Sequence, residues 1–255
     1  MKFAAIADVH GNCVALEAVL ADIAAVGITD VVNLGDHVSG PLEARRTADL
    51  LIERGFPSIR GDQDRRLVEI EPGTGASNRG DYRQLDRKHL DWMASQPPTM
   101  VYRNDIFLCH GSPRSDATYW LDQVTNNAII QASPIEDVEA EVTGIAASLI
   151  LCGHTHIPRV VRLRDGRLVV NPGSVGCPGY AGQKPVSHKV EAGPPMPATP
   201  FSNLHGRGGE QQFGTCRTTT CRWLNWREET NSQYGPVRWL QVGFDEGSCV
   251  RAVPL

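Results

Sequence analysis

The stretch KFAAIADVHGNCVALEAVLADIAAVGITDVVNLGD, residues 2–36, decides the fold because its pattern changes from strand to helix and back to strand. Lys2–Ala7 is a short apolar run that predicts a strand, and Val31–Leu34 predicts a second one. Asn12 is a typical helix N-cap, and Gly27 ends the helix that follows it. The apolar positions of this helix repeat at helical spacing and predict one buried face: Val14, Leu16, Val19, Leu20, Ile23 and Val26.

The same alternation continues along the chain and predicts an α/β fold. A helix over Pro41–Glu53 and a strand over Ser58–Arg60 complete a β-α-β-α-β order, which favours a largely parallel sheet covered by helices. The Gly- and Ser-rich segment 71–81 predicts a mobile loop. The later predicted elements are a helix over 86–95, strands over 100–102 and 106–109, a helix over 135–147, a strand over 149–152, and a hairpin of 160–163 with 168–170.

Composition limits the classes of function. The net charge is −4 and the sequence has no basic run, which argues against binding to a nucleic-acid scaffold. No stretch reaches the roughly 18 apolar residues of a membrane span, and the N-terminus reads as a strand rather than a signal peptide. The seven cysteines are an odd number without CxxC pairs, which favours reduced thiols. We therefore expect a cytoplasmic protein that acts on a small molecule without membrane contact; its oligomeric state stays open.

Carboxylate and imidazole side chains follow each predicted strand. In an open α/β sheet, ligands bind beyond the carboxyl ends of the strands, so these side chains are the candidate site. Mixed ligands of this kind suit divalent transition metals, and their number points to two ions. A carboxylate between the ions offsets their repulsion, and Asp36 is our choice for it. The candidates are Asp8, His10, Asp36, Asp62, His110, His154 and His156.

The motifs that carry these residues occur in a characteristic order. DVH (8–10), GDHVSGP (35–41), RGDQD (60–64), HGSP (110–113) and GHTH (153–156), followed by NPGSVG (171–176), resemble the signature of the calcineurin-like metallophosphoesterase superfamily, in its small bacterial phosphodiesterase branch. The resemblance covers about residues 1–190. It implies an α/β fold, a two-sheet α/β/β/α sandwich, with a dinuclear metal centre in which a metal-bound hydroxide attacks a phosphoester, most simply a phosphodiester.

The resemblance also implies a division of the ligands between two divalent ions. One ion takes Asp8, His10, Asp36 and His156, and the other takes Asp36, Asp62, His110 and His154. Manganese is the first candidate metal, with iron, nickel or zinc as alternatives. Asn12 is explained by helix capping, and within NPGSVG we expect Gly173 and Ser174 to shape the wall of the pocket.

The third motif departs from the pattern of the family. It reads Gly61-Asp62-Gln63-Asp64, where the family has Asn at the second position and His or Cys at the third. Asp62 can still bind a metal, and its extra charge makes the metal pair less electrophilic. Gln63 cannot donate a proton as an acid. The predicted catalytic set is Asp36, Gln63 and His110, and the protein is a metal-dependent phosphoesterase; the alternative is a weakly active or inactive binding or regulatory protein with the same fold.

Residues 191–255 form an atypical tail. No lysine follows Lys189, and three tryptophans lie in this segment. One back-translation of residues 193–204, read in another frame, resembles the strand that the family places after NPGSVG, and residues 215–227 shifted in the same direction resemble the family's closing strand. Two interpretations stay open, a frameshifted tail or a genuine divergent extension. The frameshift predicts loss of the late strands, poor packing and ready proteolysis after about Val190.

Overall fold

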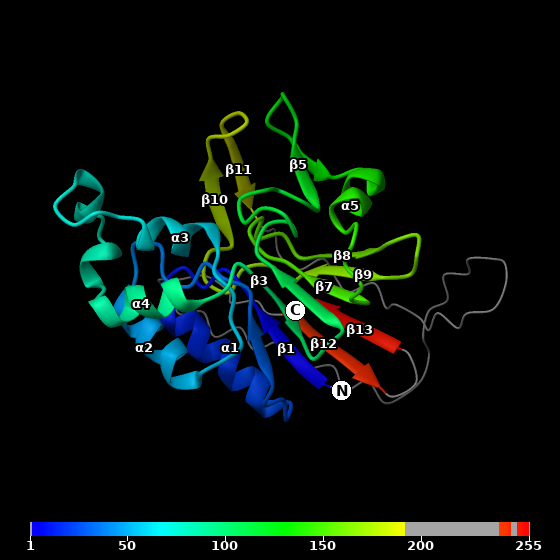
Figure 1. The fold of residues 1–255 in the computed structure, drawn as a ribbon, viewed down its shortest axis with the longest axis horizontal. Coiled ribbons are helices and arrows are strands. Elements are labelled where there is room, and N and C mark those ends of the chain that lie inside the picture. The colour runs from blue at the N-terminus through cyan, green and yellow to red at the C-terminus, as the bar shows by residue number, and fades with distance from the viewer. Residues whose placement is uncertain (1, 192–239, 246–248, 255) are drawn as a thin grey trace, which may run out of the picture.

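The computed structural model describes residues 2–191, 240–245 and 249–254 and begins with the predicted β-α-β-α order (Figure 1). Its first elements are strand β1 (Lys2–Ile6), helix α1 (Cys13–Ala25), strand β2 (Val31–Asn33) and helix α2 (Ala44–Arg54). β1 and β2 pair in parallel, as the alternation predicts. Asn12 caps α1 through a hydrogen bond that its side chain accepts from the backbone N–H of Ala15, so the predicted helix start is confirmed.

A second sheet is built from the later strands. Its strands are β3 (Thr99–Tyr102), β4 (Ile106–Cys109), β7 (Leu149–Leu151), β8 (Arg159–Arg162) and β9 (Leu168–Asn171), in the order β3-β4-β7-β9-β8. β4, β7 and β9 pair in parallel, whereas the edge strands β3 and β8 run antiparallel to their neighbours. The hairpin predicted for residues 160–163 and 168–170 is therefore the β8–β9 pair.

The two sheets pack face to face, and helices cover their outer faces. Alternate side chains of β1 point in opposite directions, as expected for a strand: Phe3 and Ala5 enter the core between the sheets, whereas Ala4 and Ile6 pack against α1. On the far side, Ile150 of β7 packs with Val138 of helix α5 (Ile135–Glu141). Figure 1 shows this order of layers, with α1, α2 and helix α4 (Arg87–Ser95) on one side and α5 on the other. The predicted α/β/β/α sandwich is confirmed.

Several predicted elements differ in detail. The strand predicted over Ser58–Arg60 makes only one isolated parallel bridge, from Ser58 to Asn33, because the chain then enters helix α3 (Asp62–Val68), which was not predicted. α5 ends six residues before the predicted end, since Gly144 takes a left-handed conformation. Val14 does not join the buried face of α1; it is one of the exposed large apolar residues. The segment predicted as a loop contains the short 3-10 helix η1 (Gly75–Asn78), and η2 (Tyr82–Gln84) follows it.

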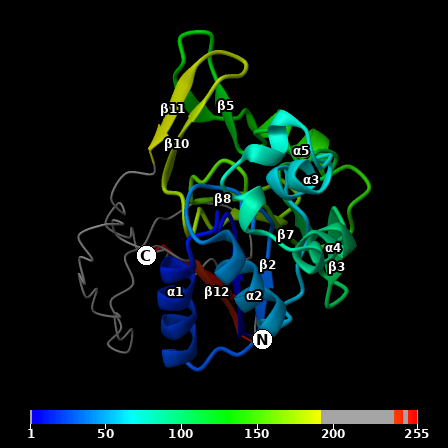
Figure 2. The same ribbon diagram turned by 90° about the vertical axis from the view of Figure 1, so that its left-hand side faces the viewer.

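Two small hairpins that the sequence analysis missed extend from the same end of the sandwich (Figure 2). One pairs β5 (Asp122–Val124) with β6 (Ile130–Ala132), and the other pairs β10 (Gly179–Gly182) with β11 (His188–Glu191). Both lie beyond the carboxyl ends of the parallel strands. No described helix is long and apolar enough to cross a bilayer.

The tail contributes two strands to the first sheet. β12 (Leu240–Asp245) pairs antiparallel with β1, and β13 (Cys249–Pro254) pairs antiparallel with β12. These two segments pair with the first sheet, whereas the frameshift interpretation predicts loss of the late strands. Residues 192–239 lie outside the described residues, so the domain boundary and the origin of the tail stay predictions.

Candidate metal centre

Six of the seven predicted ligands lie where the chain leaves a strand, and the seventh, Asp62, is the first residue of α3. Asp8 and His10 follow β1, Asp36 follows β2, His110 follows β4, and His154 and His156 follow β7. Five residues of this set have positive φ: Asp8, His10, Asp36, His154 and His156. Left-handed backbone is uncommon outside glycine and carries local strain, which concentrates at functional sites. The sharp turns that this conformation produces direct side chains from both sheets to one place.

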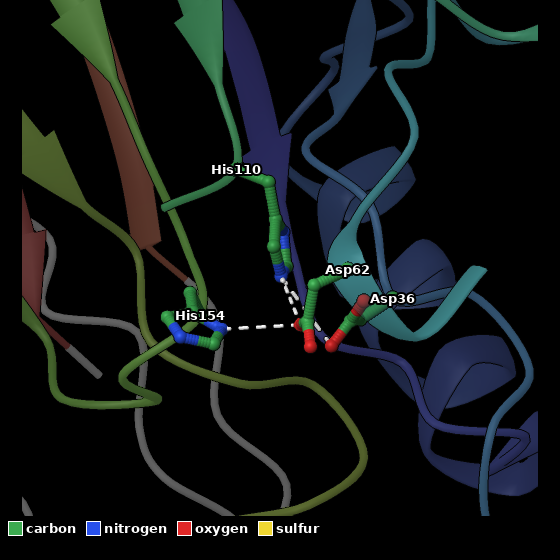
Figure 3. Close-up of side chains that lie close together, drawn as sticks. All are labelled: Asp36, Asp62, His110 and His154. Carbon is green, nitrogen blue, oxygen red and sulfur yellow. Dashed lines mark ion pairs between the residues drawn. The ribbon is translucent and has the colours of Figure 1, made fainter. Parts of the chain in front are cut away.

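Four of the predicted ligands form the first group, drawn in Figure 3. Single ligand atoms of Asp36, Asp62, His110 and His154 lie within 4.8 Å of one another. The Nε2 atom of His110 is 3.3 Å from Asp36 Oδ2 and 3.6 Å from Asp62 Oδ1. The Nδ1 atom of His154 is 3.3 Å from the same Asp62 oxygen. This group has the donor set that we predicted for one of the two ions.

Asp8, His10 and His156 form the second group. His156 Nε2 lies 3.3 Å from Asp8 Oδ1, and His10 Nε2 lies 3.7 Å from Asp36 Oδ2. The same Asp36 oxygen therefore faces a histidine of each group. The structure therefore brings all seven predicted ligands together, and the bridging role of Asp36 stays a prediction.

Hydrogen bonds fix three of the four histidines in one orientation. The Nδ1 atoms of His10, His110 and His156 lie 2.9, 2.7 and 2.5 Å from the backbone carbonyl oxygens of Ser39, Leu34 and Cys177. A carbonyl oxygen only accepts, so each Nδ1 carries a proton and donates it. Each Nε2 is then left to face the centre. This arrangement, in which the second ring nitrogen donates to a carbonyl, is typical of histidines that bind metals.

Buried atoms at the centre lack hydrogen-bond partners within the described part of the chain. Asp8 Oδ1, Asp62 Oδ1 and His110 Nε2 are buried without one, although they converge on the same point. Leaving such atoms unpaired costs about 1–3 kcal/mol each. The Nε2 atoms of His10 and His156 also lie only 3.1 Å apart. A divalent cation in each group would satisfy these atoms, so the residues fit the metals that the sequence implies.

The pKa shifts of the ligand residues in the metal-free centre also indicate a site that favours positive charge. Burial favours the neutral form of His110, yet Asp36 and Asp62 raise its pKa well above its ordinary value. Burial likewise opposes the charge on His156, but Asp8 raises its pKa to about 10. Burial opposes the ionisation of Asp62, but its histidine neighbours lower its pKa to about 2. Asp36 and Asp62 thus favour a positive charge on His110, and Asp8 favours one on His156, when no cation is bound. Burial and the neighbouring His156 instead lower the pKa of His10.

Two residues of the third motif that lie outside the predicted ligand set, Gln63 and Asp64, orient the centre. The buried Asp64 carboxylate accepts hydrogen bonds from the backbone N–H groups of Asp36 and Gly61, at 2.8 and 3.0 Å. The backbone N–H of Gln63 donates to Asp36 Oδ1, and its side-chain amide donates to Asp62 Oδ2, both at 2.9 Å. Gln63, predicted in the catalytic set, therefore lies at the centre with its side-chain amide positioning Asp62.

The extra charge of Asp62 has a partner on the next turn of α3. Arg66 Nη2 lies 3.0 Å from Asp62 Oδ2, and half of the Arg66 side chain is exposed. Asp62 therefore presents one oxygen to the histidines and the other to Arg66 and Gln63. Arg66 offsets part of the charge that we expected to weaken the metal pair as an electrophile.

Comparison with known proteins identifies the family. Residues 1–191 match the model of the calcineurin-like phosphoesterase superfamily domain. The chain belongs to this superfamily. Its structure is similar to that of a metallophosphoesterase from Sphaerobacter thermophilus, with a TM-score of 0.56, 28% identity, and coverage of 75% of this chain and 89% of that one. A hypothetical protein from Pyrococcus horikoshii has a TM-score of 0.55 at 20% identity, covering 75% and 87% of the two chains. No curated protein matches the sequence.

The NPGSVG segment of this phosphoesterase domain supports the turn after β1. Ser174 Oγ donates to the backbone carbonyl of Asp8 at 2.7 Å, and the backbone N–H of Gly176 donates to the same carbonyl at 3.1 Å. The side chain of Asn12 donates to the carbonyl of Gly176, in addition to capping α1. The segment therefore fixes the left-handed turn that presents Asp8.

Sequence reasoning missed the groups that surround the ligands. The carbonyls of Ser39 and Cys177 have no sequence signal because every residue has a carbonyl. Tyr119 and Tyr180 contact the ligand histidines: Tyr119 packs edge-on against His154 with ring centroids 5.2 Å apart, and Tyr180 packs against His156 at 4.7 Å. Tyr119 follows HGSP by six residues, but only the folded chain brings it to the site.

Proposed function

We propose that the protein is a metal-dependent phosphoesterase that hydrolyses a small phosphoester, a phosphodiester first, with water as the nucleophile. One observation carries the proposal: seven ligand-type side chains from two sheets converge, with buried unpaired atoms directed at one another. Membership of the phosphoesterase superfamily supports the same reaction class.

The proposed division of the ligands follows the two groups. Asp36 would contact both ions, while Asp8, His10 and His156 hold one, and Asp62, His110 and His154 hold the other. Two divalent ions, manganese as the first candidate and iron, nickel or zinc as alternatives, would supply positive charge to the phosphoryl group and make water a better nucleophile.

The chain itself prepares the site for this chemistry. Asp64 and the Gln63 backbone hold Asp36 between the groups, and the carbonyl partners of the histidines keep each Nε2 facing inward. Preorganised ligands of this kind bind without rearrangement. We further propose a cytoplasmic location without a nucleic-acid scaffold or membrane partner; the free thiols of Cys13, Cys109, Cys152 and Cys177 support a reducing compartment.

The test combines metal analysis with ester hydrolysis. Purified protein is loaded with manganese, desalted, and assayed on 4-nitrophenyl phosphate and on methyl 4-nitrophenyl phosphate. We expect two ions per chain and turnover that is higher on the diester. Asp36→Asn should abolish turnover, whereas Asp49→Asn, which alters a surface carboxylate paired with Lys88, should not. Two bound ions without turnover of any ester would favour the binding or regulatory alternative.

A further inference from the structure

Tyr119, Tyr180 and His188 form a hydrogen-bonded chain beside the candidate centre. The hydroxyl groups of Tyr119 and Tyr180 contact each other, and the Tyr119 hydroxyl lies 3.2 Å from His188 Nε2. His188 Nδ1 lies 2.8 Å from the carbonyl oxygen of Val186, so this nitrogen carries a proton and donates it. The chain therefore runs from a buried imidazole through two phenols.

This chain spans both groups of ligands. Tyr119 contacts His154 of the first group, and Tyr180 contacts His156 of the second. The two tyrosines come from different parts of the fold, one just before β5 and the other on β10, and their hydroxyls contact each other. An ester held by both groups would therefore have the phenols as neighbours.

A glycine in the β10–β11 hairpin leaves space for the imidazole ring of His188. Gly182 lies directly opposite His188 in the strand register. A Cβ atom at position 182 would lie only 2.4 Å from the His188 ring, so a side chain there would displace it. His188 is 4% exposed, which makes its contact with Tyr119 its main route for exchanging a proton with the site.

The protons of this hydrogen-bonded chain, His188–Tyr119–Tyr180, can be arranged in two ways. When His188 is neutral, its Nε2 accepts from the Tyr119 hydroxyl, and the Tyr119 oxygen accepts from Tyr180. When His188 is charged, Nε2–H donates to Tyr119, Tyr119 donates to Tyr180, and the Tyr180 O–H is free to donate outward. Burial raises the pKa of both phenols, which keeps them neutral. Only His188 changes charge between the two states.

We propose that His188, Tyr119 and Tyr180 form a proton relay that protonates the leaving oxygen of the ester, the role that Gln63 cannot fill. The inference rests on the proposed function. As the phosphorus–oxygen bond breaks, the leaving oxygen takes the Tyr180 proton, Tyr180 takes the Tyr119 proton, and Tyr119 takes the Nε2 proton of His188. The imidazole ends neutral, and each phenol loses one proton and gains one.

Calorimetry tests the relay without turnover. Dimethyl phosphate is an anion across the working pH range, and its oxygens accept hydrogen bonds, so its binding should select the charged state of His188. Titration of the manganese-loaded protein at pH 8 in two buffers of different ionisation enthalpy measures the number of protons that the protein takes up on binding. We expect less uptake in Tyr119→Phe and His188→Gln than in the unmodified protein, and unchanged uptake in the control Tyr82→Phe, whose hydroxyl lies near the Ile70 carbonyl. Equal uptake in all four proteins overturns the relay.

Leaving-group dependence provides the second readout. General acid assistance is typically worth about 10²–10⁴ in rate, so Tyr119→Phe should slow hydrolysis of methyl phenyl phosphate by at least about 10²-fold and that of methyl 4-nitrophenyl phosphate by less than about threefold. His188→Gln and Tyr180→Phe should show the same selective loss. Equal losses on both esters would mean that the tyrosines only shape the site, which also overturns the relay. If the unmodified protein cleaves neither ester, the proposed function fails, and the calorimetric comparison still decides whether the proton chain exists.

Discussion

Gly61→Ala is the most direct perturbation of the centre that leaves every predicted ligand in the sequence. A Cβ atom on residue 61 would lie 2.2 Å from Asp36 Oδ1 and 2.6 Å from the Asp36 backbone nitrogen. Ordinary van der Waals contact begins at 3.4 Å, so the carboxylate must move by roughly 1 Å. Metal–ligand distances tolerate only about ±0.2 Å. Asp36 therefore cannot keep its position between the two groups of ligands.

The expected cost has two parts. Overpacking a tight site typically costs about 1–3 kcal/mol. Moving Asp36 Oδ1 also breaks the 2.9 Å hydrogen bond from the Gln63 backbone, and a hydrogen bond to a charged group is worth about 1.5–3 kcal/mol. The free energy of unfolding should thus fall by about 2.5–6 kcal/mol, less than the total stability of many domains. Loss of a hydrogen bond that supports a metal ligand typically lowers metal affinity by about 10–100-fold. Because Gly61→Ala displaces the ligand itself, manganese affinity should fall by more than this.

Metal content after desalting and denaturant unfolding of the metal-free protein measure these two effects. Gly75→Ala is the matched control, because a Cβ there meets no atom within 4 Å. The control should bind manganese and unfold like the unmodified protein. If Gly61→Ala binds two ions with unchanged affinity, the placement of Asp36 between the groups is wrong.

Three further predictions follow from the same contacts. Asp36→Asn should reduce the occupancy of both ions, whereas His10→Ala should mainly reduce one; metal analysis of Asp36→Asn with two tightly held ions would contradict the shared oxygen. Manganese binding at pH 7 should release protons from His156, whose pKa of about 10 keeps it charged in the metal-free protein, so affinity should increase with pH; calorimetry without proton release would disprove this. Burial opposes the ionisation of Asp81, but Arg79 and the backbone N–H groups of Tyr82 and Gly40 lower the pKa of this carboxyl group below 3.8. The ionised carboxylate therefore contributes fully to the free energy of unfolding above pH 3.8. This contribution is lost as the pH falls through the lower pKa of the folded protein. Asp81→Asn should therefore cost roughly 2 kcal/mol in metal-free protein at pH 7 and much less at pH 2, as measured by urea unfolding; an equal cost at both pH values would refute the argument.

The local sequence pattern was sufficient to predict the β-α-β start of the fold and most of the strands. The apolar runs over residues 3–6 and 149–151 are buried on both faces, so their composition alone marks them as central strands. Helix ends and short hairpins were less predictable. The residues of β10, Gly179–Gly182, show no strand alternation, and the hairpin with β11 depends on pairing between strands.

The identity of six of the seven candidate ligands was available from the sequence because they follow strands that end at a common edge; the seventh, Asp62, begins helix α3. Asp8, His110 and His154 stand directly beyond apolar runs, and any parallel arrangement of those runs brings their turns together. The residue types then limited the chemistry to divalent metals. These inferences need only the direction of each strand.

The tertiary structure alone decided how those side chains act. Which histidine nitrogen faces the centre depends on backbone carbonyls such as that of Leu34, which lies 76 positions before His110 in the chain. The charge compensation of Asp62 by Arg66 and the alignment of His188 with Tyr119 likewise depend on side-chain direction. A sequence pattern records which residue occupies a position and on which face it lies. Hydrogen bonds and proton positions depend on distances of a few tenths of an ångström between segments far apart in the chain, and only packing sets those distances.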